Sequence, residues 1–86
     1  MIKKSVTLTN PEGLHARPAA LFVKEANKYE SSLEIESDSR RVNGKSIIGI
    51  MSLGAFQGEE ITLSASGPDE EEMVNGLADL LQKSFE

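Results

Sequence analysis

The run Gly13-Leu14-His15-Ala16-Arg17-Pro18 contains the only histidine of the chain. Proline has no N–H, so Pro18 is tolerated in the first turn of a helix but not in its interior, and the residues after it favour a helix. His15 is therefore expected at or near the N-cap, just before the unpaired N–H groups of Ala16 and Arg17. These N–H groups and the positive end of the helix dipole form an anion site. A nucleophilic imidazole beside a guanidinium at such a site suits accepting and holding a phosphoryl group.

A lone histidine is more commonly a surface or capping residue than a functional group. Two features favour a functional role for His15. Ser, Thr, Asp and Asn are the preferred N-cap residues, so a helix that begins at histidine gives up a contribution of roughly 1 kcal/mol. Gly13, Arg17 and Pro18 also each have a local role in shaping an anion pocket. The functional interpretation is therefore preferred.

Ser46 is a second candidate. It precedes a short apolar segment in which Ile47, Ile50 and Met51 share one face, and Gly54 is suited to end a helix there. Serine is a preferred N-cap, so the local sequence favours a capping role for Ser46. A phosphate on Ser46 would also lie at a helix N-terminus, where its charge is tolerated. Both roles stay open.

The elements that position these residues follow from the hydrophobic pattern. Apolar and polar side chains alternate in several segments, which is typical of strands with one buried face. The expected strands lie near residues 2–9, 33–36, 40–43 and 61–66. The expected helices follow Pro18, follow Ser46 and begin around Pro68-Asp69. The buried stripe of the last helix is expected at Met73, Leu77, Leu80 and Leu81, with Phe85 a further candidate.

The expected order is therefore β-α-β-β-α-β-α. Each strand has one apolar and one polar face, which predicts an antiparallel sheet with one face open to water and helices on the other. The fold class is α+β: four strands in an antiparallel sheet, covered on one face by three helices. The 86 residues suffice for a single domain, 1–86, with one modest core.

Bulk composition excludes several classes of function. The chain has nine Lys and Arg against fourteen Asp and Glu, a net charge of −5, which argues against nucleic acid as the main partner. The absence of cysteine excludes disulfides and thiolate metal sites. No segment approaches the roughly 20 apolar residues that cross a bilayer, so no membrane insertion is expected. We expect a soluble cytoplasmic protein without a metal or cofactor.

The run from Gly13 to Pro18, followed by Ala19-Ala20, resembles the active-site signature of HPr, the histidine-containing phosphocarrier of the bacterial phosphoenolpyruvate-dependent sugar phosphotransferase system. The segment 43–54, Asn-Gly-Lys-Ser-Ile-Ile-Gly-Ile-Met-Ser-Leu-Gly, resembles the second signature of that family. The two matches have the family's order and separation, and with the overall length they cover essentially the whole chain. The resemblance implies the HPr-like open-faced β-sandwich, the same order that the hydrophobic pattern predicts.

The resemblance also implies a mechanism. Enzyme I, phosphorylated by phosphoenolpyruvate, would transfer its phosphoryl group to Nδ1 of His15, which would pass it to sugar-specific IIA proteins or domains. Arg17 would neutralise charge during the transfer, and the N–H groups of Ala16 and Arg17 would hold the phosphate. The protein would be a stoichiometric carrier rather than an enzyme.

In the family, the serine that matches Ser46 is a regulatory phosphorylation site. The surrounding segment is most similar to the Gram-positive branch, although Ile48 replaces a methionine common there. This branch implies two further partners, an ATP-dependent HPr kinase/phosphorylase and a catabolite-control transcription factor. Docking of partners is expected on Ala20, Ile47, Ile48 and Met51, whereas core packing has at least equal weight for Ile50 and Leu53.

Three alternatives stay open. A regulatory HPr paralogue would act through protein–protein interaction, but such proteins lose the active histidine, and His15 is present. A dedicated phosphocarrier, such as one of the nitrogen branch, would use the same chemistry with other partners. A pure interaction module would require an unreactive His15. A monomer is expected, and Phe56 is either an exposed loop aromatic or a cap on the core; the sugars served are not encoded in this chain.

Overall fold

The computed structural model describes residues 1–9, 11 and 13–82. Within these residues the order β-α-β-β-α-β-α is confirmed. The elements are β1 (Ile2–Thr7), α1 (Ala16–Ala26), β2 (Ser32–Ser37), β3 (Arg40–Asn43), α2 (Ile47–Leu53), β4 (Glu60–Ser66) and α3 (Glu70–Gln82). Phe85, a candidate for the stripe of the last helix, lies outside the described residues.

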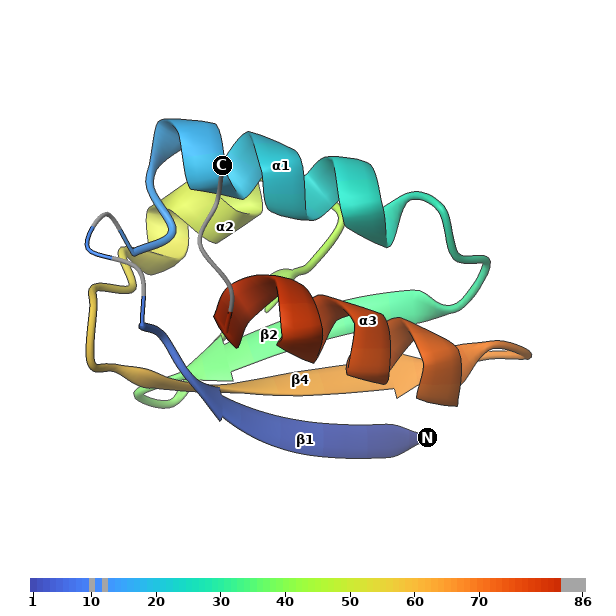
Figure 1. The fold of residues 1–86 in the computed structure, drawn as a ribbon. Coiled ribbons are helices and arrows are strands. Elements are labelled where there is room, and N and C mark those ends of the chain that lie inside the picture. Colours follow the sequence, from blue (N-terminus) through green and yellow to red (C-terminus); the bar gives the residue numbers. More distant parts are fainter. Residues whose placement is uncertain (10, 12, 83–86) are drawn as a thin grey trace.

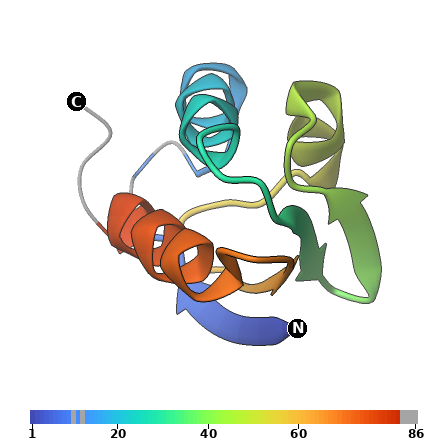
Figure 2. The same cartoon turned by 90° about the vertical axis from the view of Figure 1, so that its right-hand side faces the viewer.

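The described strands form one antiparallel sheet in the order β1-β4-β2-β3. Apolar residues face one another across the strands, for example Val6 opposite Ile61 and Ile35 opposite Leu63. The described helices all lie on one face of this sheet, with α3 nearest β1 and β4 and with α1 beside α2 (Figures 1 and 2). The predicted α+β fold with one open sheet face is confirmed.

The core lies between the sheet and the helices. It takes the apolar face of the strands and one face each of α1 and α3, because these are the faces that can leave water. Of the stripe predicted for the last helix, Met73, Leu77 and Leu81 are buried, whereas Leu80 is only partly buried against the core. The fully buried side chains include Leu8, Leu14, Phe22, Ile35, Ile50, Ile61, Leu63, Met73, Leu77 and Leu81. Leu14 and Pro18, which lie before and after His15 in the chain, are both buried. Their packing in the core fixes the start of α1.

The turn between β2 and β3 places two non-glycine residues in the left-handed region, Asp38 at φ 49° and Ser39 at φ 67°. Two-residue hairpin turns of this kind favour Asp-Gly. We therefore expect Ser39→Gly to raise the free energy of unfolding by about 0.5–1 kcal/mol. Asp38→Gly should raise the free energy of unfolding by less, since Asp tolerates the left-handed conformation better than Ser does. Urea unfolding of both variants tests this, and an unchanged or lowered stability of Ser39→Gly would contradict it.

Asp69 precedes α3 and ties it to the segment that leads into β2. Its carboxylate accepts hydrogen bonds from the Ser31 hydroxyl and from the N–H groups of Glu30 and Ser31, both at 2.9 Å. The Asp69 N–H in turn donates to the Ser31 Oγ at 3.1 Å. The hydrogen bond from the Ser31 hydroxyl, with that from the Glu30 N–H, lowers the pKa of Asp69 below its usual 3.8.

Because the folded state lowers this pKa, the Asp69 carboxylate contributes stability above pH 3.8, and the contribution is lost as pH falls through the folded value. We expect Asp69→Asn to reduce stability at neutral pH and to approach wild type in acid. Ser31→Ala removes the hydrogen bond from the Ser31 hydroxyl to the Asp69 carboxylate. Its free energy of unfolding should therefore also depend less on pH than that of wild type. Urea titrations between neutral pH and about pH 2 measure this, and a parallel pH dependence in all three proteins would refute it.

Candidate functional site

His15 is the N-cap of α1, as the position of Pro18 predicts. Its backbone is extended, with φ −89° and ψ −165°, and its carbonyl oxygen accepts the Ala19 N–H at 2.7 Å. Its side chain makes no capping hydrogen bond among the described residues. Pro18 occupies the third helical position and has no N–H, which removes one of the two usual donors to an N-cap side chain. The imidazole is therefore exposed at the start of the helix and is not engaged in capping.

The N–H groups next to His15 can bind an anion. Within the described part of the chain, the N–H groups of Ala16 and Arg17 have no hydrogen-bond partner. They lie at the positive end of the dipole of α1, and the Arg17 side chain is exposed beside them. This arrangement brings together the three residues that the sequence assigns to phosphoryl transfer. Residues 1–9, 11 and 13–82 contain no cluster of three His, Cys, Asp or Glu side chains suited to a metal ion.

The segment after α2 supports the histidine. The Leu14 N–H donates to the Ala55 carbonyl at 3.0 Å, and Ala55 is fully buried. Gly13 has φ +62°, and a Cβ there would overlap the Ala55 carbonyl and lie 2.9 Å from the Phe56 Cα. Glycine is thus required at position 13 for both its conformation and the close approach of the two segments. The start of α1 and the end of α2 consequently lie side by side (Figure 1).

Phe56 lies next to the histidine. The ring centroids of His15 and Phe56 are 5.6 Å apart, with an interplanar angle of 55°. Phe56 is 58% exposed, so of the two roles that the sequence leaves open, the exposed loop aromatic is correct. No local pattern could have paired it with His15, because the contact depends on how α1 and α2 pack.

Ser46 is the N-cap of α2. Its Oγ accepts the Gly49 N–H at 3.0 Å, so the capping role is confirmed. Gly54 ends the helix in the left-handed conformation at φ 65°, as predicted. Ser46 is at the end of α2 away from His15, and seven helical residues span roughly 10 Å. The two candidate phosphorylation sites are therefore distinct.

Several apolar side chains of α2 are exposed. Ile48 is 82% exposed, Met51 45% and Ile47 42%, and Ala20 is exposed on the neighbouring α1. We call Ile47, Ile48 and Met51 the α2 apolar surface. Ile50 and Leu53 are buried in the core. Of the three apolar residues expected on one face of this helix, Ile50 is thus fully buried, whereas Ile47 and Met51 stay partly exposed at its edge. The side chain of Arg40 holds α2 to β3 by donating hydrogen bonds to the carbonyls of Ser52 and Leu53 at the negative end of the helix.

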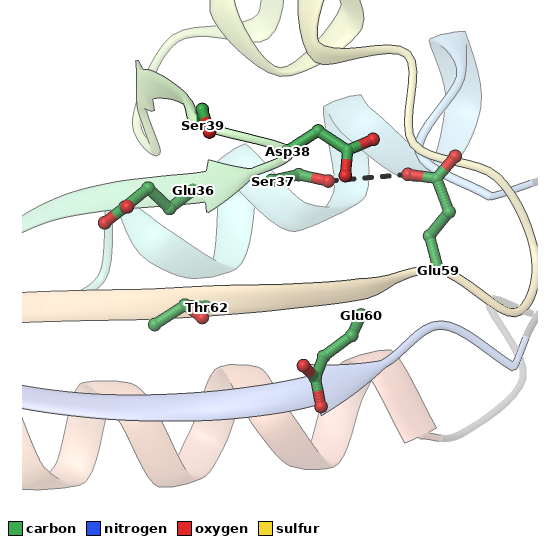
Figure 3. A pocket seen from close by; sticks show the side chains of 7 residues that line it. All are labelled: Glu36, Ser37, Asp38, Ser39, Glu59, Glu60 and Thr62. Carbon is green, nitrogen blue, oxygen red and sulfur yellow. Dashed lines mark hydrogen bonds between the residues drawn. The ribbon is translucent and has the colours of Figure 1, made fainter.

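A hollow elsewhere on the surface has a different character. It has a volume of about 340 Å³ and lies at the turn between β2 and β3 and the start of β4 (Figure 3). Its lining residues are Glu36, Ser37, Asp38, Ser39, Glu59, Glu60 and Thr62. The carboxylates among them repel a phosphoryl anion. None of the residues assigned to phosphoryl transfer lies in this hollow, so the exposed start of α1 remains the candidate site.

The chain therefore has an exposed histidine at the N-terminus of a helix that packs on one face of a four-stranded antiparallel sheet. Residues 2–83 match the family model described as the phosphotransferase-system HPr component phosphorylation site, so the chain belongs to the HPr family. Among its relatives, the HPr-like protein Crh of Bacillus subtilis is 47% identical over 83 residues, covering 96% of this chain and 98% of Crh. The phosphocarrier protein HPr of Treponema pallidum is 42% identical over 86 residues, covering 100% of this chain and 98% of that protein.

Solved structures of HPr and of Crh have the same fold as this chain. The crystal structure of HPr-C-His from Thermoanaerobacter tengcongensis has a TM-score of 0.92 and 51% identity, covering 95% of this chain and 92% of that one. A crystal structure of Bacillus subtilis Crh, with 48% identity, a TM-score of 0.77 and coverage of 95% and 94%, is an intertwined dimer with a swapped domain. The expectation of a monomer is therefore not supported, because a relative can exchange an element between copies while keeping the same contacts. Within the described residues, no helix is long and apolar enough to cross a membrane.

Proposed function

We propose that the protein is a cytoplasmic phosphocarrier that accepts a phosphoryl group from phosphorylated enzyme I on His15 and donates it to IIA proteins or domains. The observation that carries this proposal is the exposed imidazole of His15, which makes no capping hydrogen bond, beside the N–H groups of Ala16 and Arg17, which have no partner among the described residues. Membership of the HPr family supports it, as does the relative from Treponema pallidum that is named a phosphocarrier.

In the proposed reaction, unprotonated Nδ1 of His15 attacks the phosphorus of phosphorylated enzyme I. The new N–P bond forms as the bond to the donor breaks, and enzyme I keeps the electron pair of that bond. Arg17 and the N–H groups at the start of α1 stabilise the charge on the phosphoryl oxygens, which is the main catalytic requirement of a loose transition state. The same step in reverse, with a IIA acceptor, returns His15 to its free form. The protein is then a stoichiometric carrier rather than an enzyme.

Partner docking is proposed on Ala20 and the α2 apolar surface. These side chains are exposed although they are apolar, and exposed apolar patches of this kind commonly mark protein–protein contacts. They lie on the helices that flank His15, so one contact area would bring a partner to the histidine. Enzyme I and the IIA proteins are the proposed occupants.

Ser46 is proposed as a regulatory phosphorylation site for an ATP-dependent HPr kinase/phosphorylase. The phosphorylated form would bind a catabolite-control transcription factor. Ser46 is half-buried at the N-terminus of α2, where the helix dipole tolerates a phosphate. The similarity to Crh supports the link to regulation, since the Bacillus subtilis structure is described as a catabolite repression protein.

The similarity to Crh also favours one alternative, a regulatory HPr-like protein that acts through protein–protein interaction. A dedicated phosphocarrier of the nitrogen branch would share the histidine chemistry. Incubation with enzyme I and phosphoenolpyruvate, followed by the mass of the intact protein, separates a phosphocarrier from a purely regulatory protein, whereas partner specificity decides between the two kinds of phosphocarrier. One phosphoryl group that is lost in acid and survives alkali supports a phosphohistidine carrier. An unmodified protein would leave the regulatory function, to be tested on Ser46 with ATP and the kinase.

A further inference from the structure

The side chain of His15 has little to hold it in one orientation. It makes no capping hydrogen bond among the described residues, and it is exposed. Without a further restraint, an exposed side chain of this kind would sample several rotamers on the picosecond to nanosecond timescale. Its ring neighbour in the described structure is Phe56, at 5.6 Å between centroids and 55° between planes. This tilted arrangement is among the favourable geometries of aromatic pairs.

Phe56 is itself well placed to restrain another ring. Ala55 before it is fully buried, and its carbonyl accepts the Leu14 N–H at 3.0 Å. The carbonyl of Phe56 accepts the Glu59 N–H at 3.1 Å. Hydrogen bonds of Ala55 and of Phe56 itself therefore hold the backbone here, and the one at Ala55 links the residue before Phe56 to the residue before His15. The exposure of its ring, 58%, is not explained by core packing.

We propose that Phe56 is a positioning residue for His15, restricting the imidazole to a narrow range of orientations from which Nδ1 accepts the phosphoryl group. This inference rests on the proposed function and adds a residue that neither sequence signature contains. A nucleophile held near its attack geometry reacts faster, and small misplacements cost rate without preventing binding. The expected loss on removing the Phe56 ring is roughly threefold to tenfold in the rate of transfer, the range that one aromatic pair contributes.

The test compares Phe56→Ala, Phe56→Leu and Ile48→Ala with wild type. Phe56→Leu keeps apolar bulk but removes the aromatic ring, and Ile48→Ala removes an exposed apolar side chain from the α2 apolar surface. Transfer from phosphorylated enzyme I gives KM and turnover for each carrier. Nuclear magnetic resonance of the unphosphorylated proteins gives the rotamer distribution and ring-proton shifts of His15. Amide spectra check that each variant is folded, which the exposure of Phe56 and Ile48 favours.

For both Phe56 variants we expect lower turnover at nearly unchanged KM, loss of the ring-current shift at His15 and a broader rotamer distribution. Ile48→Ala should instead raise KM and leave the His15 signals in place. Wild-type rates in the Phe56 variants, or an imidazole equally ordered without the Phe56 ring, would overturn the inference. A raised KM with unchanged turnover would also overturn it, because Phe56 would then be a docking residue. Failure of wild type itself to accept a phosphoryl group would instead overturn the proposed function, and this inference with it.

Discussion

The His15→Ala variant should gain no phosphoryl group from phosphorylated enzyme I, a complete loss against one group per molecule for wild type. The variant removes the proposed nucleophile and leaves the rest of the site in place. The imidazole makes no capping hydrogen bond in the described structure, so its removal costs the fold little. Arg17 and the N–H groups of α1 cannot replace it, because they stabilise charge but form no bond to phosphorus.

His15→Asn is a sharper variant of the same experiment. Asparagine is among the best N-cap residues, and the Arg17 N–H, which has no partner in the described part of the chain, can donate to it. We therefore expect His15→Asn to raise the free energy of unfolding by about 0.5–1 kcal/mol while transfer is lost completely. Intact mass and urea unfolding measure the two effects. A gain in stability together with a loss of transfer would show that His15 lowers the stability of the protein but is needed for its reactivity.

The outcomes distinguish the possible acceptors. Phosphorylation of His15→Ala to the level of wild type would place the acceptor elsewhere in the chain and would refute the mechanism. A phosphoryl group on wild type that survives acid would likewise contradict a phosphohistidine. Unfolding curves of His15→Ala close to wild type are the control, because they show that a lost reaction is not a lost fold.

Ser46→Asp should weaken docking to enzyme I and raise the KM for transfer roughly tenfold, because like charges brought together at an interface cost binding energy. Asp imitates part of the −1.5 to −2 charge of a phosphate, so the phosphorylated protein should show a larger effect of about the same kind. Ser46 lies roughly a helix length of 10 Å from the His15 end of α2. The added charge is therefore expected to act on partner docking more than on the chemical step, with turnover changing less than KM.

Ser46→Asn is the matched control, since it keeps a good N-cap residue of similar size and adds no charge. It should raise KM far less than Ser46→Asp. The difference between the two variants should also shrink as salt rises toward about 1 M, where screening is strong. Transfer kinetics at low and high salt measure this. Equal KM values for Ser46→Asp and Ser46→Asn at low salt would contradict repulsion as the cause.

The sequence was sufficient where a structural feature depends on neighbours along the chain. Pro18 places the start of α1 within a few residues, which puts His15 at the N-cap. Ser46 and Gly54 mark the two ends of α2 in the same way. Strands with one apolar face predict the open antiparallel sheet, because a side chain must lie on one face or the other. The local pattern suggested phosphoryl transfer at His15, and the resemblance to HPr added the expected partners and the regulatory role of Ser46.

The sequence was insufficient where a feature depends on packing between distant segments. It left Ile50 and Leu53 undecided between core and surface, and the structure buries both of them. It could not relate Phe56 to His15, which meet because Gly13 lets the start of α1 approach the segment after α2. The expected monomer also depended on contacts outside one chain, and a relative's dimer leaves it unsupported.

The sequence by itself therefore determined the elements and their order, since helix capping and side-chain alternation are local and strongly constrained. It also singled out His15 and Arg17 as the residues proposed to carry out phosphoryl transfer. Only the tertiary structure decided which side chain lies against the imidazole and how far each apolar residue of α2 is exposed. The physical reason is that these contacts form when the helices pack on the sheet, and packing joins residues that no spacing in the sequence relates.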